Sequence, residues 1–294
     1  MAILSAITLY PIKSCAGIAL HTATLTRAGL TAGPVSDREW MLVDAEGHFL
    51  TQRAHPRMAL IVPTLIVPTL TAPGSSVQTL QVRAPGMAPL DIALAWPDAL
   101  AAPRAMVQVW DDRVMAFDCG DACAAWFSTA LKVPCRLVRF DPACARQASA
   151  TWTGEVVAPT RFTDGFPLLV IGSASLLDLN QKLLAAGRAS LPMDRFRPNL
   201  VFDDIEAFDE DVSESFKLGS MLLKPVKPCA RCPIPSIDQM TGQAGPDPLD
   251  LLRSYRAKPA LDGAICFGMN CIVVEGEPQT IRVGQQVDVE LAFL

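Results

Sequence analysis

The chain is organised around the stretch Lys227-Pro228-Cys229-Ala230-Arg231-Cys232-Pro233-Ile234-Pro235-Ser236-Ile237-Asp238. Each proline in it fixes its own φ angle, lacks a backbone N–H donor and disfavours helical geometry in the residue before it. The stretch lies between a strand-like run at residues 220–226 and a turn at Thr241-Gly242. The sequence therefore predicts a stiff loop here, rather than a helix or an interior strand.

Two interpretations of Cys229 and Cys232 follow from the residues alone. The thiolate is the form of cysteine that binds metal, a neighbouring arginine such as Arg231 favours it, and sulfur ligands select soft or borderline metals. Alternatively, both cysteines are small apolar side chains that pack beneath the loop, as free cysteine often does. A single Cys-x-x-Cys pair leaves both interpretations open.

Zinc is a less favoured form of the metal interpretation. Structural zinc sites use two tight, regular pairs of ligands, whereas the second pair here, Cys266 and Cys271, is split by four residues at the start of a strand-like run. A Ser-His-Asp site is not indicated, because the three histidines lie in the first quarter of the chain without a nucleophile motif. No glycine-rich phosphate loop or dinucleotide fingerprint follows a predicted strand.

The bulk composition indicates a folded protein without a nucleic-acid partner. The 294 residues allow one large domain or two modest ones, and the net charge of −5 offers no basic surface for nucleic acid. The nine cysteines, an odd number, come without a secretory signal, so a cytoplasmic location is predicted. The most apolar stretch, residues 59–70, is interrupted by proline and falls short of the about 20 residues that span a membrane. No membrane segment is therefore predicted.

Short strands at close spacing dominate the first half, and helices enter later. One helix is predicted to be capped by Asp118 or Asp121, a second by Ser173 or Ser175, and a third to begin at Pro248. The repeat of Ile-Val-Pro-Thr-Leu at residues 61–65 and 66–70 predicts a duplication in an edge strand that tolerates proline. We predict an α+β fold, predominantly β, with either two β domains or one barrel and an elaborated front half. The domain boundary is placed between residues 1–145 and 146–294.

One set of residues suggests a ligand. Cations and a hydroxyl group lie in predicted loops or at strand ends, and a cysteine adjoins the last of them: Lys13, Ser14, Arg38, Arg197, Arg231 and Cys232. Arginine suits bidentate recognition of phosphate, and lysine acts as a point charge. Such a set fits a phosphorylated cofactor that presents a metal to one thiolate.

Several motifs carry a resemblance to a known family. They are Tyr10-Pro-Ile-Lys-Ser-Cys-Ala-Gly17, Asp37-Arg38-Glu39-Trp40, Phe196-Arg-Pro-Asn199, Cys229-Ala-Arg-Cys232 and the turn from Asp238 to Gly242. In this order, over nearly the whole chain, they resemble the MOSC-domain proteins, in the branch that contains the mitochondrial amidoxime-reducing component and its bacterial relatives. The resemblance implies a MOSC β-barrel domain and an N-terminal β-rich domain that enclose a molybdenum cofactor.

The resemblance also implies roles for individual residues. Cys232 is implied to be the thiolate ligand of molybdenum, which leaves Cys229 as a packing residue, and Asp164 is a candidate proton relay. The residues implied to hold or border the pterin and its phosphate are Lys13, Ser14, Arg38, Gly165, Arg197, Asn199, Ala230 (through its backbone), Arg231 and Asn270.

The implied activity is the reduction of N-hydroxylated compounds, namely amidoximes, hydroxylamines and N-hydroxylated bases. The expected cofactor is molybdenum bound to molybdopterin, without haem, flavin or an iron–sulfur cluster in this chain. The membrane anchor of mitochondrial members and the ferredoxin-like extension of some bacterial members are not found, so electrons are expected from a separate protein, ferredoxin-like or cytochrome b5-like with a reductase. The alternative is a non-catalytic cofactor-binding or sulfur-carrier protein. Pro235-Ser236 and Asp238-Gln239 depart from the family pattern, which concerns the polarity of the substrate pocket.

Overall fold

The computed structural model describes residues 1–66, 79–95, 103–276 and 278–292. Within this part, seven strands form a closed barrel, because the last strand of the series pairs again with the first. The order around the barrel is β13 (Leu168–Gly172), β14 (Leu200–Asp203), β1 (Ala2–Leu9), β20 (Gln286–Leu291), β15 (Ser213–Leu218), β16 (Met221–Ala230) and β18 (Ala264–Glu275). The prediction of a predominantly β fold with a barrel is confirmed.

Strand β16 corrects one prediction, because it continues through Pro228 and Cys229 to Ala230 and the loop begins only at Arg231. Proline removes a ladder donor, so it is tolerated in a sheet chiefly at edges and bulges. The pairing of β16 with β18 shifts register between Pro225 and Lys227 and again between Pro228 and Ala230. These irregularities allow a proline-containing strand to occupy the interior of the sheet.

Three smaller sheets make up most of the N-terminal half. One has the order β10 (Arg104–Val109), β11 (Asp112–Asp118), β12 (Arg136–Phe140) and β6 (Trp40–Val43). A second runs β7 (Val62–Ile66), β8 (Thr79–Arg83) and β9 (Leu90–Ala93), so the proline-containing β7 is an edge strand, as predicted. Most of the second copy of the repeat, residues 67–70, lies outside the described residues. The third sheet runs β19 (Gln279–Arg282), β3 (Thr22–Thr26), β4 (Gly29–Ala32) and β5 (Val35–Ser36).

The two halves of the chain exchange strands. Strand β1 begins the chain but lies in the barrel between β14 and β20, where β2 (Ile18–Leu20) also pairs with it, and β19 from the C-terminal half pairs with β3. A single hydrophobic core accordingly contains Leu4 and Phe216 of the barrel together with Trp40 and Phe127 of the N-terminal half. The division at residues 145 and 146 remains a prediction, but the packing shows that the junction between the halves is extensive.

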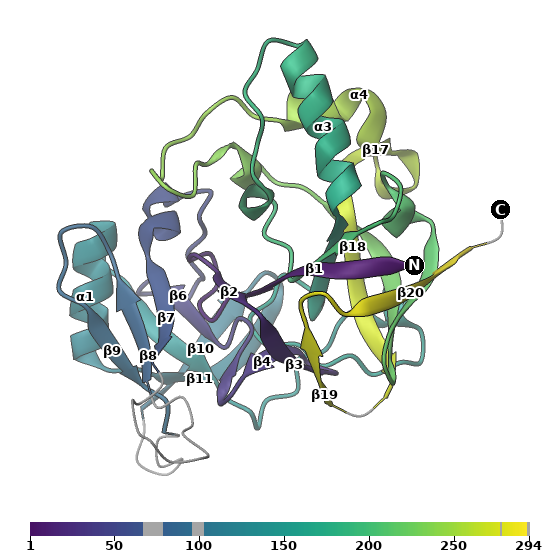
Figure 1. The fold of residues 1–294 in the computed structure, drawn as a ribbon. Coiled ribbons are helices and arrows are strands. Elements are labelled where there is room, and N and C mark those ends of the chain that lie inside the picture. The colour runs from purple at the N-terminus through teal and green to yellow at the C-terminus, as the bar shows by residue number, and fades with distance from the viewer. Residues whose placement is uncertain (67–78, 96–102, 277, 293–294) are drawn as a thin grey trace.

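Helices cover the outside of these sheets. Helix α1 (Asp121–Leu131) lies on the N-terminal half, and α3 (Ser173–Ala185) and α4 (Leu249–Arg256) lie together at one end of the barrel (Figure 1). A short α2 (Ala150–Thr153) lies in the connection between the halves. The predicted caps are wrong, since Gly120 and Gly172 occupy the N-cap positions without side-chain caps. No helix in the described part of the chain has the length and hydrophobicity needed to cross a membrane.

Candidate functional site

A buried carboxylate, Asp37, connects the two halves at the base of the candidate site. Its side chain is 0% exposed and accepts hydrogen bonds from the backbone N–H of Tyr10 over 2.9 Å and from Nδ2 of Asn199 over 3.1 Å. It also forms an ion pair with Arg38. Both acids that flank Arg38 in the sequence, Asp37 and Glu39, are buried, so this ion pair lies in the interior.

Two arginines from different halves converge on one aromatic ring. The guanidinium carbons of Arg38 and Arg197 each lie 4.3 Å from the centroid of the Tyr10 ring. Nη2 of Arg197 donates a 2.6 Å hydrogen bond to the carbonyl oxygen of Cys15. Burial lowers the pKa of Arg197, and the positive charge of Arg38 lowers it further. These surroundings therefore disfavour the positive charge of Arg197 unless an anion lies close to it.

Arg197 has no carboxylate within ion-pair distance among the described residues, although it is only 8% exposed. Arg38 is neutralised by Asp37, whereas the partners of Arg197 in the described ranges are a carbonyl oxygen and an aromatic ring. A buried cation is costly unless it is paired. This part of the protein therefore has the charge distribution expected of a site for an anionic group.

Backbone geometry singles out the same residues. Ser14, Arg38 and Arg197 have φ angles of 66°, 47° and 58°. Left-handed conformations are uncommon for residues other than glycine, and they concentrate at functional sites. Ser14 follows β1, whereas Arg38 and Arg197 come shortly before β6 and β14, so each side chain lies in a connection next to a strand.

Lys13 and Asp164 bring a third segment to the site. Nζ of Lys13 lies 2.5 Å from Oδ1 of Asp164 and donates a 2.8 Å hydrogen bond to the carbonyl oxygen of Phe162. Burial lowers the pKa of Lys13, although the carboxylate of Asp164 opposes this effect. Desolvation acts to raise the pKa of Asp164, but the charge of Lys13 and the hydrogen bonds from Lys13 and Trp110 hold that pKa well below its usual range. Asp164 is therefore ionised at neutral pH and serves as an acceptor.

The loop that carries Cys232 is attached to the segment that carries Arg197. Nη2 of Arg231 donates a 2.8 Å hydrogen bond to the carbonyl oxygen of Phe196, the residue before Arg197. Arg195 donates to the carbonyl oxygen of Pro235 over 3.2 Å and to the carboxylate of Asp238 over 2.7 Å. Residues on both sides of Cys232 are thus held against residues 195–196.

The two cysteines of the motif have different surroundings. Sγ of Cys229 accepts a 3.2 Å contact from Nη1 of Arg231, and its side chain packs against the core cluster around Phe196 and Phe267. Cys232 is half-buried and has no hydrogen-bond partner among the residues that the structure describes. The thiol of Cys232 therefore makes fewer hydrogen-bonding contacts than that of Cys229 among the described residues. Cys266 and Cys271 are buried in β18, and no cluster of three or more His, Cys, Asp or Glu side chains with metal-binding geometry occurs in the described ranges.

The remaining predicted residues connect to this centre through the backbone. Oδ1 of Asn199 accepts hydrogen bonds from Arg38 over 3.2 Å and from the N–H of Leu169 over 3.1 Å. Leu169 also pairs with Asn270 across β13 and β18. Ala230 is exposed at the end of β16, and the space beside the α-carbon of Gly165 is open, since a Cβ atom there would touch nothing within 4 Å.

Sequence reasoning missed several residues at the site. Asp37 and Tyr10 were identified only as members of motifs, without a role at the site. An aromatic and cationic group beside Asp164, formed by Phe49, Arg53 and Trp110, was not predicted at all. The one available signal was Trp110 itself, a large aromatic residue directly before Asp111 and Asp112.

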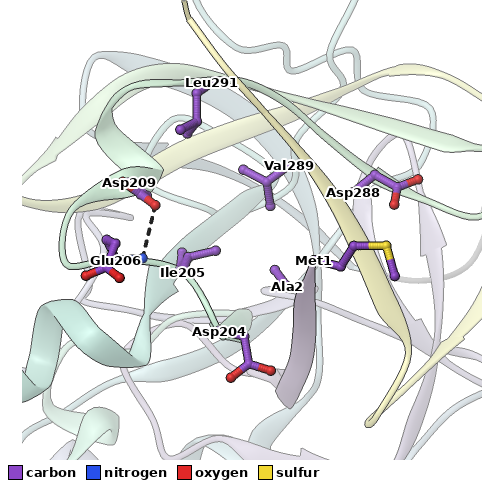
Figure 2. Close-up of a pocket in the computed structure, with 9 residues that line it drawn as sticks. All are labelled: Met1, Ala2, Asp204, Ile205, Glu206, Asp209, Asp288, Val289 and Leu291. Atoms are coloured by element: carbon purple, nitrogen blue, oxygen red, sulfur yellow. Dashed lines mark hydrogen bonds between the residues drawn. The ribbon is translucent and has the colours of Figure 1, made fainter.

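A pocket of about 330 Å³ lies elsewhere, between the start of β1 and β20. Figure 2 shows that Asp204, Glu206, Asp209 and Asp288 surround it, and no lysine or arginine lines it. Four carboxylates repel an anionic ligand. Of the two regions, the one around Arg197 fits a phosphorylated cofactor.

Comparison with known proteins identifies the family of this chain. The model of the MOSC N-terminal beta barrel domain matches residues 1–134, and that of the MOSC domain matches residues 158–288. Mitochondrial amidoxime reducing component 2 of Rattus norvegicus is 34% identical over 96% of this chain and 82% of its own length. Mitochondrial amidoxime-reducing component 1 of Homo sapiens is 32% identical over 95% and 80%. A molybdenum cofactor sulfurase of Oryza sativa subsp. japonica is 33% identical over 97% of this chain and 35% of its own length.

These relatives also correct the predicted location. The sequence predicts a cytoplasmic protein from unpaired cysteines and the lack of a secretory signal, but the amidoxime-reducing relatives are named mitochondrial. The prediction is wrong because a reducing compartment explains free thiols without identifying which compartment it is. Two domain models in sequence and identities above 30% over nearly the whole chain show that this chain belongs to the MOSC-domain family, together with the amidoxime-reducing components.

Proposed function

We propose that this protein is a molybdenum-cofactor-dependent reductase of N-hydroxylated compounds, namely amidoximes, hydroxylamines and N-hydroxylated bases. The observation that carries the proposal is Arg197, a buried cation that lacks a carboxylate partner in the described part of the chain and lies beside Arg38. The names of the amidoxime-reducing relatives supply the reaction class.

The residues present fit the cofactor. Lys13, Arg38, Arg197 and Arg231 would neutralise its phosphate, and the thiolate of Cys232 would ligate molybdenum. Ser14, Gly165, Asn199, Ala230 and Asn270 complete the proposed surroundings. The cofactor, when bound, would supply the electron transfer that removes oxygen from nitrogen, while the protein supplies binding, orientation and charge.

The side chains of the chain itself have separate tasks in this proposal. Lys13 retains its proton on Nζ because Asp164 lies beside it, so it keeps a positive charge in a buried position. Asp164 is ionised, so it accepts hydrogen bonds from a substrate N–H or O–H instead of donating a proton. The proposed proton-relay role of Asp164 is thereby narrowed to that of an acceptor. Arg195 and Arg231 hold the Cys232 loop in one orientation.

Electrons would come from a separate protein, ferredoxin-like or cytochrome b5-like with a reductase. The donor would need only a transient contact, since electron-transfer encounters rest on small interfaces. The net charge of −5 does not identify the electron donor.

A second candidate function is that of a non-catalytic cofactor-binding or sulfur-carrier protein. The match to a molybdenum cofactor sulfurase favours it, because this chain aligns with 35% of that longer protein. Both functions need the same cations and the same cysteine. They differ in whether the loaded protein turns over a substrate.

Turnover of benzamidoxime by the molybdenum-loaded protein, with a chemical reductant in place of the donor, tests the proposal. Formation of benzamidine at more than one equivalent per molybdenum is expected. Loaded protein that forms none supports the carrier function instead. Protein with Lys182→Met, a change in an exposed ion pair on α3, is the matched control and is expected to keep the full rate.

A further inference from the structure

We propose that Trp110 is the specificity-determining residue of this site and that its indole ring stacks against planar, conjugated substrates. The inference rests on the proposed reductase function and names the part of the substrate that the protein recognises. Trp110 belongs neither to the sequence motifs nor to the cations of the candidate site, and the inference assigns it a role.

The backbone at Trp110 is strained. Val109 pairs with Asp112 across the hairpin of β10 and β11, so Trp110 and Asp111 form a two-residue turn. Trp110 has a φ angle of 55°, in the region that glycine prefers in such turns. A bulky residue there is an outlier, and strain of this kind persists where a side chain has a function. Glycine or asparagine would form the turn more easily.

The side chain is held in place although it is 41% exposed. Its Nε1–H donates a 3.0 Å hydrogen bond to Oδ1 of Asp164. The ring centroid of Phe49 lies 5.1 Å from that of the indole, at an interplanar angle of 59°, and the guanidinium of Arg53 lies 5.0 Å from the indole. Three separate segments thus fix the orientation of a solvent-facing aromatic ring.

The indole ring of Trp110 lies next to the cations of the candidate site. The oxygen atom that accepts the indole N–H also accepts Nζ of Lys13, so both donors share Oδ1 of Asp164. The other oxygen, Oδ2, has no partner among the described residues, and the Asp164 side chain is 77% exposed. The arrangement offers an electron-rich ring and a free anionic acceptor side by side.

These two groups match the two parts of an aromatic amidoxime. The amino N–H of the amidoxime can donate to Oδ2 of Asp164, while the conjugated ring lies against the indole. A small aliphatic amidoxime offers the same N–H but no ring. The indole should therefore discriminate between the two, whereas the carboxylate should not.

If Trp110 served only the turn, Trp110→Gly would leave the affinity for the aromatic substrate unchanged, whereas the inference predicts a weaker affinity. Trp110→Gly suits the left-handed turn, so relief of strain offsets the lost contacts with Phe49 and Arg53. The variant should stay folded. Trp110→Phe keeps a ring, without the N–H donor, and is a second variant for the case in which the glycine variant unfolds.

Calorimetric titration of the molybdenum-loaded protein with benzamidoxime and with acetamidoxime tests the inference. Trp110→Gly should bind benzamidoxime about ten-fold more weakly, the size of one aromatic stacking contact. Its affinity for acetamidoxime should change by less than about two-fold, its molybdenum content should equal that of the parent protein, and Trp110→Phe should keep most of the affinity. Trp126→Leu on α1, whose indole N–H donates to the carbonyl oxygen of Ala88 and not to Asp164, is the control.

Each other result overturns the inference. Equal losses for both ligands would show a general structural effect, unchanged affinity would show a bystander, and lost molybdenum would assign Trp110 to the cofactor. Absence of saturable benzamidoxime binding to the parent protein also overturns it. Binding that depends on Trp110 without turnover would instead contradict the reductase function and leave the aromatic site standing.

Discussion

Arg197 donates a 2.6 Å hydrogen bond to the carbonyl oxygen of Cys15, so a residue that precedes barrel strand β14 reaches the N-terminal loop that carries Lys13 and Ser14. The contact spans 182 residues of sequence. It places a buried cation at the junction of the two halves, where Asp37 and Asn199 already join them. The proposed anion site would therefore be a property of the assembled molecule and of neither half alone.

Arg197→Met should abolish cofactor retention without unfolding the protein. Replacement of a buried, unpaired charge by an apolar side chain is often neutral for stability, so the free energy of unfolding of the cofactor-free protein should change by less than about 2 kcal/mol. Loss of one charge-assisted contact to a phosphate should lower molybdenum content at least about ten-fold. Metal analysis and urea unfolding measure the two effects. A variant that keeps its molybdenum would remove Arg197 from the site.

Asp37→Asn should destabilise the protein strongly, since Asp37 is the buried counter-ion of Arg38 and also accepts the N–H of Tyr10. Removal of one partner of a buried ion pair costs about 3–5 kcal/mol. Asp250→Asn breaks the exposed pair with Arg188 and should cost less than about 1 kcal/mol. Urea unfolding of both variants checks the contrast, and similar losses in the two would contradict the central position given to Asp37.

Glu210 should make the protein less stable as the pH rises. Burial raises the pKa of this carboxyl, which is 0% exposed and accepts a 2.8 Å hydrogen bond from Ser175. Between its ordinary pKa and the raised one, the folded state binds more protons than the unfolded state, so stability decreases with pH across that window. Glu210→Gln should therefore have a flatter pH dependence of stability than the parent in the pH range above the ordinary pKa of 4.5. Chemical unfolding at several pH values tests this, and identical slopes would show that Glu210 is not protonated on folding.

Arg195→Met should loosen the Cys232 loop. Arg195 is the side chain that holds Pro235 and Asp238 against the segment before β14. Without it, amide hydrogens at residues 236–242 should exchange with solvent about ten-fold faster, because local opening becomes easier. Hydrogen exchange with mass spectrometry measures the effect, with Arg188→Met, which removes a pair with Asp250 on α4 instead, as the control. Unchanged exchange would show that other contacts hold the loop.

Strand positions were predictable from the sequence because their signals are local. Short strands at close spacing were predicted for the first half, and the proline-tolerant edge strand β7 followed from the limits that proline sets in sheets. The caps were not predictable. Asp118 is engaged by Arg136 and by the N–H of Gly120, and the hydroxyl of Ser175 binds Glu210, so tertiary contacts had taken both capping groups.

The candidate site was predictable only as a set of residue types. Cations at strand ends and a thiol suggested a phosphorylated ligand, and the order of the motifs gave the family. The burial of Asp37, the absence of a carboxylate partner for Arg197 within the described ranges, and the contact between Trp110 and Asp164 depend on pairings more than 20 residues apart. Such pairings follow from the strand exchange between the halves, which no local pattern encodes.

Molybdenum content of Cys232→Ser and Cys229→Ser proteins, purified from a host that makes molybdopterin, tests the central claim most directly. The parent and Cys229→Ser should each hold about one molybdenum per chain, whereas Cys232→Ser should hold less than about a tenth of that, since serine is a poor ligand for a soft metal. Full molybdenum in Cys232→Ser, or stoichiometric zinc that is lost in Cys266→Ser, would contradict the account.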